Sequence, residues 1–348
     1  MAEPICIDGS YGEGGGQILR TSLALAAILK QPVRIDNIRA SRKKSGLKTQ
    51  HLAGALALAE ITGAEVSGAE LHSKSLLFTP KTLRGGRYRF EISTAGSACM
   101  LLGTVLPPLL FAAESSEITI TGGTHVPFSP PFDFLDRVFL PLLRKLGAAV
   151  QLELKRWGFY PKGGGEIKAY VKPCRGLQGL QLKERGSLQR LNISACSANL
   201  PGHIAQREIA HLEACLADYR GKTISNALAS RALCPGNFVS LEAEYVHTVA
   251  GFNGLGKRGK PAEEVASGVC RDFIRFDRTG ATVDQHLADQ IILYMALAHG
   301  DSFFLTPEIT SHLQTNINVI RRFLPVNIKL DRTSGAVQIT GAGKAIEN

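Results

Sequence analysis

Asp8-Gly9-Ser10-Tyr11-Gly12-Glu13-Gly14-Gly15-Gly16-Gln17-Ile18-Leu19-Arg20 is the stretch around which this sequence is organised. Five of its thirteen residues are glycine, and it lies between a short apolar run and an apolar-periodic segment. Glycine clusters occur where the chain turns at positive φ or where a ligand lies against bare main chain. A glycine loop that opens a helix also directs backbone N–H groups at whatever lies above it, which suits a phosphate. A tight strand-to-helix turn would need the same glycines, and glycine content alone favours neither interpretation.

Two well-known phosphate loops do not match this stretch. No Gly-Lys-Ser/Thr follows the glycines as it would in a P-loop, and Gln17 stands where a dinucleotide fingerprint has its third glycine. Glu13 nevertheless favours a ligand, because a carboxylate inside an anion-binding loop is unfavourable unless a cation lies nearby. We expect that cation to be Mg²⁺ bound to a nucleotide.

The composition describes a soluble globular chain of one large or two ordinary domains, with 348 residues and 44% hydrophobic residues. The longest apolar run, Leu101–Ala113, is short and contains two prolines, so we expect no membrane span. The seven cysteines form no C-x-x-C pair, which argues against a disulfide framework or zinc cluster and fits the reducing cytoplasm. The first residues lack the basic and apolar regions of a signal peptide. A net charge of +10 favours a polyanionic partner without separating RNA, ATP or mere solubility.

One pattern recurs along the chain. Residues 60–66, 144–150 and, more loosely, 322–328 each read as a helix end that turns into a strand, and the two intervals differ by about ninety residues. We therefore predict an α/β (α+β) fold of three repeated units with two helices and four strands each, whose sheets pack around a shared centre. Residues 1–182 and 280–348 would form this large domain. A small α/β domain would be inserted at 183–279.

Local periodicity supports these units. In the first unit we predict helices over 17–30 and 49–62; in the insertion, helices over about 205–219 and 262–276; and in the third unit, a helix from Asp284 to His299 and another starting near Thr315. The densest basic run, Arg39–Lys48, follows the first unit's glycine loop by one supersecondary unit. A solvated loop and a phosphate-binding loop are both open interpretations of this run.

His312 is the best placed of the nine histidines. It precedes the helix expected near Thr315, where an anionic group on its ring would be favoured. A lone histidine is more often an ordinary hydrogen-bonded residue, and the sequence shows no legible catalytic triad, because triads are assembled in space.

Several ordered stretches closely resemble the RNA 3′-terminal phosphate cyclase family. They are Asp8–Arg20, Ile38–Ala40 with Gly46-Leu47 and Gln50–Leu52, Gly158–Pro161 with Gly163–Gly165, Leu287–Gln290, and His312-Leu313 with Thr315-Asn316. The resemblance covers nearly the whole chain. It implies a large domain of three repeats like the C-terminal domain of translation initiation factor three, plus a smaller inserted domain.

The resemblance also implies a three-step reaction. A histidine attacks the α-phosphorus of ATP to give histidyl-AMP, AMP passes to an RNA 3′-terminal phosphate, and the 2′-OH then closes a 2′,3′-cyclic phosphate. A covalent imidazole adduct divides one hard transfer into easier steps. RNA would be the partner, Mg²⁺ or Mn²⁺ the metal, and a homodimer is possible.

The resemblance assigns roles residue by residue. His312 would be the nucleophile and Glu13 the metal ligand. Phosphates of ATP or RNA would be held by Gln17, Arg20, Arg39, Arg42 and Gln50, and the nucleotide site would comprise Gly103, Pro130, His286, Leu287, Ala288, Asp289 and Gln290. Two positions depart from the family pattern: His286 stands where a tyrosine commonly stacks on adenine, and Gly103 where a glutamine commonly contacts the nucleotide.

Two other classes of function compete with the enzyme. Eukaryotic cyclase-like proteins share this fold and act in ribosome assembly without cyclase activity, but they lack the histidine nucleophile, whereas His312 is present here. A small-molecule transferase on a similar repeat fold has only analogy behind it. We therefore favour the enzyme.

Overall fold

The computed structural model describes residues 3–344, so residues 1–2 and 345–348 of the predicted large domain lie outside the described part. The first unit comprises β1 (Ile5–Asp8), α1 (Gly16–Leu29), β2 (Val33–Asp36), α2 (Thr49–Thr62), β3 (Glu65–Ser67) and β4 (Leu76–Thr79). Its sheet has the order β1-β2-β4-β3, in which β1 and β2 are parallel and the other pairs antiparallel. The two helices end at Lys30 and Gly63. Both of these residues have a left-handed backbone conformation, which turns the chain toward the next strand.

The second unit repeats this topology. It comprises β5 (Arg87–Glu91), α3 (Ala98–Leu110), β6 (Ser116–Gly122), α4 (Phe132–Phe134), the π-helix η1 (Leu135–Phe139), α5 (Leu140–Lys145), β7 (Ala149–Arg156) and β8 (Gly165–Lys172). The sheet order is β5-β6-β8-β7, again with one parallel pair, β5 and β6. The short segments α4, η1 and α5 follow one another directly and take the place of a single second helix.

The third unit contains α8 (Gln285–Leu297), β13 (Asp301–Leu305), α9 (Ser311–Phe323), β14 (Asn327–Asp331) and β15 (Ala336–Thr340). Its sheet has three strands, in the order β13-β15-β14. Gln178 and Gln181 make isolated parallel bridges to His299 and Phe303. Residues 178–181 therefore occupy the position that β1 and β5 have in the other two sheets. The repeated α/β fold class is confirmed, with an irregular segment in place of the fourth strand here.

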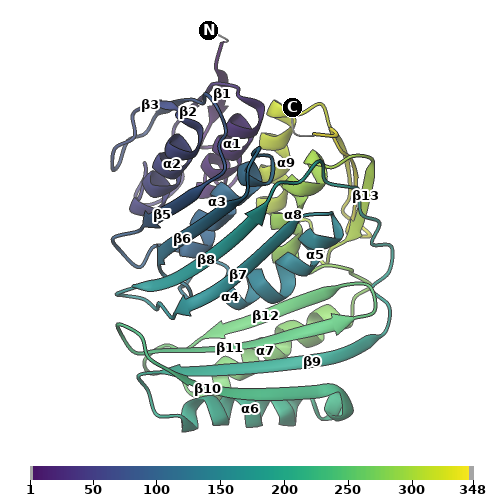
Figure 1. Cartoon of the computed structure of the whole chain (residues 1–348). Coiled ribbons are helices and arrows are strands. Elements are labelled where there is room, and N and C mark those ends of the chain that lie inside the picture. The colour runs from purple at the N-terminus through teal and green to yellow at the C-terminus, as the bar shows by residue number, and fades with distance from the viewer. Residues whose placement is uncertain (1–2, 345–348) are drawn as a thin grey trace.

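The helices of the three units pack together while their sheets lie outside them (Figure 1). The central helix α1 contacts α2, α3 and α9, and α9 also contacts α8. Their apolar faces form one continuous core, in which Leu23 and Leu58 are almost completely buried. Burial of this kind is the main favourable term in folding. Among residues 3–344, no helix is both long and apolar enough to cross a membrane.

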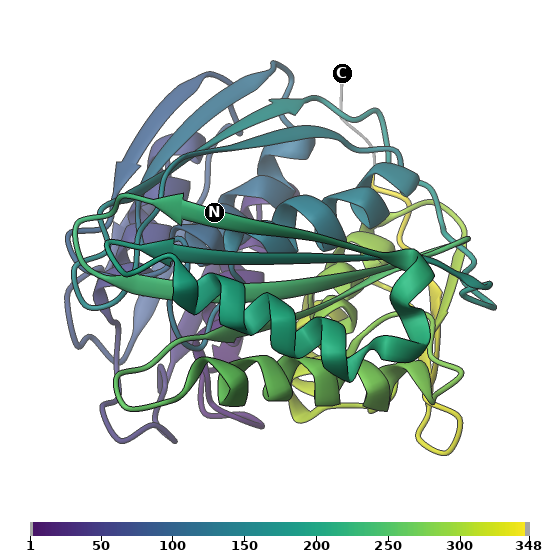
Figure 2. The same ribbon diagram turned by 90° about the horizontal axis from the view of Figure 1, so that it is seen from below.

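A fourth sheet is formed by the chain between the second and third units. It contains β9 (Leu188–Ala198), α6 (His203–Cys215), the 3₁₀-helix η2 (Ala217–Lys222), β10 (Thr223–Ser230), β11 (Gly236–Tyr245), β12 (Val249–Leu255) and α7 (Ala262–Asp277). The strand order is β10-β9-β11-β12. Figure 2 shows α6 and α7 side by side along this sheet, and the two helices contact each other. Leu191, Val239 and Phe273 belong to a separate core between them and the sheet. The domain boundaries at 183 and 279 stay a prediction.

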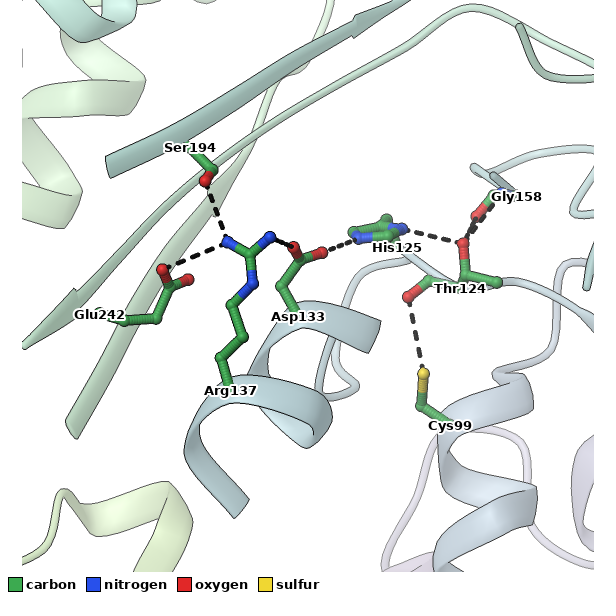
Figure 3. Close-up of polar contacts among 8 residues, drawn as sticks. All are labelled: Cys99, Thr124, His125, Asp133, Arg137, Gly158, Ser194 and Glu242. Carbon is green, nitrogen blue, oxygen red and sulfur yellow. Dashed lines mark hydrogen bonds and ion pairs between the residues drawn. The ribbon is translucent and has the colours of Figure 1, made fainter. Parts of the chain in front are cut away.

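A buried polar network joins this sheet to the second unit (Figure 3). Arg137 on η1 donates to Ser194 of β9 at 3.0 Å and pairs with Glu242 of β11 and with Asp133, each at 3.5 Å. Asp133 lies 2.8 Å from Nε2 of the buried His125. Burial raises the pKa of Glu242 to about 7. Burial also lowers the pKa of His125, so a neutral ring donates to the Asp133 carboxylate. The network fixes the loop that leads from β6 into α4.

Candidate functional site

His312 lies in the first turn of α9, which begins at Ser311. The predicted start near Thr315 is therefore wrong. The hydroxyl of Thr310 accepts a hydrogen bond from the Leu313 N–H at 3.0 Å and caps the helix four residues earlier than the apolar pattern indicates. Burial lowers the pKa of His312, and the nearby Arg20, Arg42 and His286 lower it further, against an opposite effect of Glu13. The lowered pKa favours the neutral form of the ring at pH 7.

The glycine loop lies directly against this helix start. Nε2 of His312 is 2.9 Å from Oε2 of Glu13, and Nδ1 is 3.0 Å from Oε1 of Gln17. Ser311 donates its hydroxyl hydrogen to the other oxygen of Glu13. The loop and α9 are thus joined through three contacts among four side chains from opposite ends of the sequence.

Close packing explains the glycines at two positions of this loop. Gly12 has φ 58° and Gly14 has φ 53°, both in the left-handed region. A Cβ at Gly12 would collide with the hydroxyl of Thr315 on α9, and one at Gly14 would lie 2.6 Å from Oγ of Ser41. The two interpretations of the glycine stretch are therefore compatible, because the tight turn brings the loop against the helix that carries His312.

Arg20 is a cation without an anion. It lies on α1, and among the described residues no acidic side chain pairs with it. Burial lowers its pKa to about 10, so the guanidinium stays charged at neutral pH. Arg20 is partly buried, and an unpaired, partly buried cation is unfavourable unless an anion binds it. The structure therefore favours an anionic ligand beside Arg20.

The basic run divides into structural and exposed residues. Arg39, at φ 56°, donates to the carbonyl oxygens of Lys44 (2.8 Å) and Gly46 (3.0 Å) and so closes its own loop. Arg42 instead points to the glycine loop and pairs with Glu13 at 3.3 Å. Gln50 accepts a hydrogen bond from the Ser97 N–H at 3.1 Å, which joins α2 to the loop before α3. Of these three predicted phosphate ligands, Arg42 lies nearest the His312 cluster through its contact with Glu13.

A cavity of about 520 Å³ connects His312 with most of the predicted nucleotide residues. Its lining includes Gln17, Arg20, Gly103, Pro130, His286, Asp289, Gln290 and His312. Leu287 and Ala288 do not line it, because their side chains are completely buried in the core. A side chain added at Gly103 would meet no atom within 4 Å, so the cavity has room where the family commonly has glutamine. Glu13, Arg39, Arg42 and Gln50 lie outside the lining.

Asp289 lies where α8 meets α9. Thr310 donates its hydroxyl hydrogen to Asp289 at 2.8 Å, and Asn316 donates its amide to the Asp289 carbonyl at 2.9 Å. Asn316 in turn accepts a hydrogen bond from Thr21 of α1 at 2.8 Å. Burial raises the pKa of Asp289 to about 7, and the charges of Asp284 and Glu13 act in the same direction. These bonds hold α1, α8 and α9 together around the cavity.

Sequence reasoning missed many residues of the cavity lining, among them one from the inserted sheet. Asn253 reaches the cavity from β12 of the inserted sheet, Phe128 from the loop before α4, and Tyr294 from α8. Tyr294 is visible in the sequence only as a member of a buried helical face. No spacing signal connects Asn253 with a cavity built mainly from the repeated units. Phe128 lies in a proline-rich loop, and that composition alone does not indicate a binding role.

Comparison with known proteins gives a consistent result. The description of the family that matches residues 11–330 is "RNA 3'-terminal phosphate cyclase". A protein of that name from Ralstonia nicotianae is 47% identical over 336 residues, which cover 96% of each chain. Another from Methylococcus capsulatus is 44% identical over 346 residues, covering 96% of each chain, and one from Salmonella agona is 44% identical over 340 residues, covering 97% of each.

Proposed function

The chain belongs to the RNA 3′-terminal phosphate cyclase family, and we propose on this ground that it is an ATP-dependent enzyme that converts an RNA 3′-terminal phosphate into a 2′,3′-cyclic phosphate. The observation that carries the proposal is the position of His312. Its ring is neutral and held by Gln17, and it shares a cavity with the unpaired cation Arg20. A nucleophile beside an anion site is what attack on a phosphate requires.

In the first step, we assign the attack on the α-phosphorus of ATP to Nε2 of His312. With Gln17 Oε1 accepting the Nδ1 hydrogen, the lone pair lies on Nε2, and we propose that it becomes available when Glu13, which faces Nε2 at 2.9 Å in the free protein, turns to the divalent cation. A P–N bond forms, the bond to the β-phosphate oxygen breaks, and pyrophosphate leaves. Arg20 is placed to stabilise the negative charge on the phosphate, because its guanidinium has no competing carboxylate among the described residues.

The remaining steps transfer AMP to the RNA. An oxygen of the 3′-phosphate attacks the phosphorus bound to His312, the P–N bond breaks, and the imidazole is restored. The 2′-OH then attacks the activated 3′-phosphorus and AMP leaves with its bridging oxygen, which closes the cyclic ester. Arg42 is the basic-run residue that we assign to the RNA phosphate, since its guanidinium reaches the glycine loop. Arg39 would support this role by holding the loop.

The residues present fit a divalent cation that is shared with a nucleotide. Residues 3–344 contain no cluster of three or more potential metal-ligating side chains, so the protein alone offers few ligands. Mg²⁺ is usually bound by one or two carboxylates together with substrate phosphates, and Glu13 supplies one carboxylate beside His312. Glu13 would hold Mg²⁺ or Mn²⁺, which neutralises phosphate charge when bound. The ATP itself would occupy the cavity between Pro130, His286 and Asp289.

The competing proposal is a non-catalytic RNA-binding factor. Incubation with α-labelled ATP separates the two, because only the enzyme would keep an acid-labile label on His312. We also place the protein in the cytoplasm, since all seven cysteines are free thiols. Homodimer formation stays a prediction, which sedimentation of the purified protein tests.

A further inference from the structure

Phe128 differs from every other phenylalanine of the chain. The other fourteen are buried or partly buried, whereas Phe128 is 98% exposed. Its φ of 63° is a left-handed conformation that bulky side chains rarely adopt. Both features are unfavourable in the free protein, and backbone outliers of this kind gather at ligand-binding sites.

The loop that carries Phe128 is held at both ends. On one side Val126 is buried, and Ser129 donates its hydroxyl hydrogen to the Val126 carbonyl at 3.0 Å. On the other side the Phe132 N–H donates to the Thr124 carbonyl at 3.1 Å. Three prolines within residues 127–131 further restrict the backbone. The exposed ring is therefore presented by a fixed loop.

The ring also lies on the cavity that contains His312. Phe128, Ser129 and Pro130 are consecutive lining residues, and the same lining reaches Arg20 and His312. Because Phe128 is almost fully exposed while its neighbour Pro130 is only partly so, Phe128 lies at the mouth of the cavity. A chain that enters the cavity on this side passes the Phe128 ring.

The adjoining loop, residues 157–164, also exposes an aromatic ring, together with a basic side chain. The N–H groups of Thr124 and His125 donate to the Gly158 carbonyl at 2.9 and 3.0 Å, so the two loops are bonded together. The second loop presents Tyr160, which is 68% exposed, and the exposed Lys162. Neither residues 124–131 nor residues 157–164 include an acidic side chain. Exposed aromatic rings beside basic side chains are typical of sites for single-stranded nucleic acid.

We propose that Phe128 stacks on a base at the 3′ end of the RNA substrate and so holds the strand at the mouth of the cavity. This inference rests on the proposed function. An RNA 3′ end that enters across this mouth passes the Phe128 ring on its way to His312, whereas ATP would lie deeper, between Pro130 and Asp289. Stacking tolerates any base, since every base has a π face. The terminal base would therefore be bound without strong sequence preference.

The test measures RNA binding and protein adenylation separately. Short single-stranded RNAs with a 3′-phosphate and 2-aminopurine as the last base report stacking through fluorescence quenching. Dissociation constants come separately from the fluorescence anisotropy of a dye at the 5′ end of the same RNAs. The variants are Phe128→Ala, Phe128→Trp and the control Val246→Ala, which removes another exposed hydrophobic side chain. Adenylation is measured with α-labelled ATP in the absence of RNA. Circular dichroism checks that each variant is folded.

We expect Phe128→Ala to weaken RNA binding on the order of tenfold and to abolish the quenching, whereas Phe128→Trp and Val246→Ala bind as wild type. An abasic last nucleotide should weaken wild-type binding to a similar extent and leave Phe128→Ala unaffected. Adenylation should be equal in all variants. Unchanged RNA affinity in Phe128→Ala would overturn the inference, as would a loss confined to adenylation, which would make Phe128 an ATP contact.

The outcomes also separate this inference from the proposed function. If wild type forms no adenylated protein but still quenches in a Phe128-dependent way, stacking stands and the cyclase mechanism fails. If wild type cyclises RNA and Phe128→Ala binds RNA equally well, the mechanism stands and stacking fails.

Discussion

Gly12→Ala tests whether the glycine loop is shaped by the helix that carries His312. The substitution places a methyl group on a residue at φ 58° and against the hydroxyl of Thr315. Left-handed backbone costs a non-glycine residue about 1–2 kcal/mol, and overpacking costs a further 1–3 kcal/mol, roughly. We therefore expect a total destabilisation of about 2–5 kcal/mol.

Gly63→Ala is the matched control for the backbone contribution. Gly63 has φ 60°, but nothing lies within 4 Å of an added Cβ, so only the left-handed backbone is penalised. Thr315→Ala removes the colliding hydroxyl and completes a double-mutant cycle with Gly12→Ala. We expect a coupling energy of about 1–3 kcal/mol between the two positions. The free energies of unfolding come from urea denaturation followed by circular dichroism.

Gly12→Ala should also slow the proposed adenylation of His312. Thr315 donates its hydroxyl hydrogen to the Ser311 carbonyl at 2.7 Å, within the turn that contains His312. A displaced Thr315 would move this turn, and small misplacements of a reacting group cost on the order of a hundredfold in rate. Equal destabilisation by Gly12→Ala and Gly63→Ala, with no coupling to Thr315, would refute the argument that α9 requires this glycine.

Four further substitutions make separate predictions. Arg42→Ala should slow AMP transfer to RNA by roughly ten- to a hundredfold, measured under single-turnover conditions. Arg39→Ala should mainly lower the free energy of unfolding, measured with urea, because Arg39 donates to two carbonyl oxygens of its own loop. Asp289 has a pKa of about 7 in the folded protein, so it keeps a proton that the unfolded chain releases near pH 4. The free energy of unfolding should therefore fall as pH rises between about 4 and 7. Melting temperatures measured across this range should show a flatter slope for Asp289→Asn than for the wild type. Glu13→Gln removes the charge that raises the pKa of His312, so NMR titration should show that pKa moving further down, and an unmoved pKa would contradict the contact.

The sequence predicts local structure where local signals decide it. The apolar face of α1 and the left-handed Gly63 after α2 fix both helices of the first unit within a residue of the prediction. The start of α9 was misplaced because Thr310 caps it through a side-chain hydrogen bond that apolar periodicity does not reveal. The prediction of four strands in the third unit was also wrong, because the fourth position of that sheet is filled by an irregular segment around Gln178 and Gln181.

The candidate site depends on contacts that no local pattern contains. Glu13 was predicted to need a cation, and the structure pairs it with Arg42 and places it beside His312. Ser311, which also bonds Glu13, lies 298 positions away in the sequence. The resemblance to the cyclase family brought Glu13 and His312 together as a functional set, but only the fold shows which atoms meet.

The central claim is that His312 carries AMP during the reaction. Purified wild type and His312→Asn, an uncharged variant of similar size, are incubated with α-labelled ATP and divalent cation, denatured and digested, and the labelled peptide is identified by mass spectrometry. We expect an acid-labile label on His312 in the wild type, none in His312→Asn, and equal melting temperatures for the two. A label on another residue would contradict this role of His312, as would cyclised product when His312→Asn is incubated with ATP and a 3′-phosphorylated RNA.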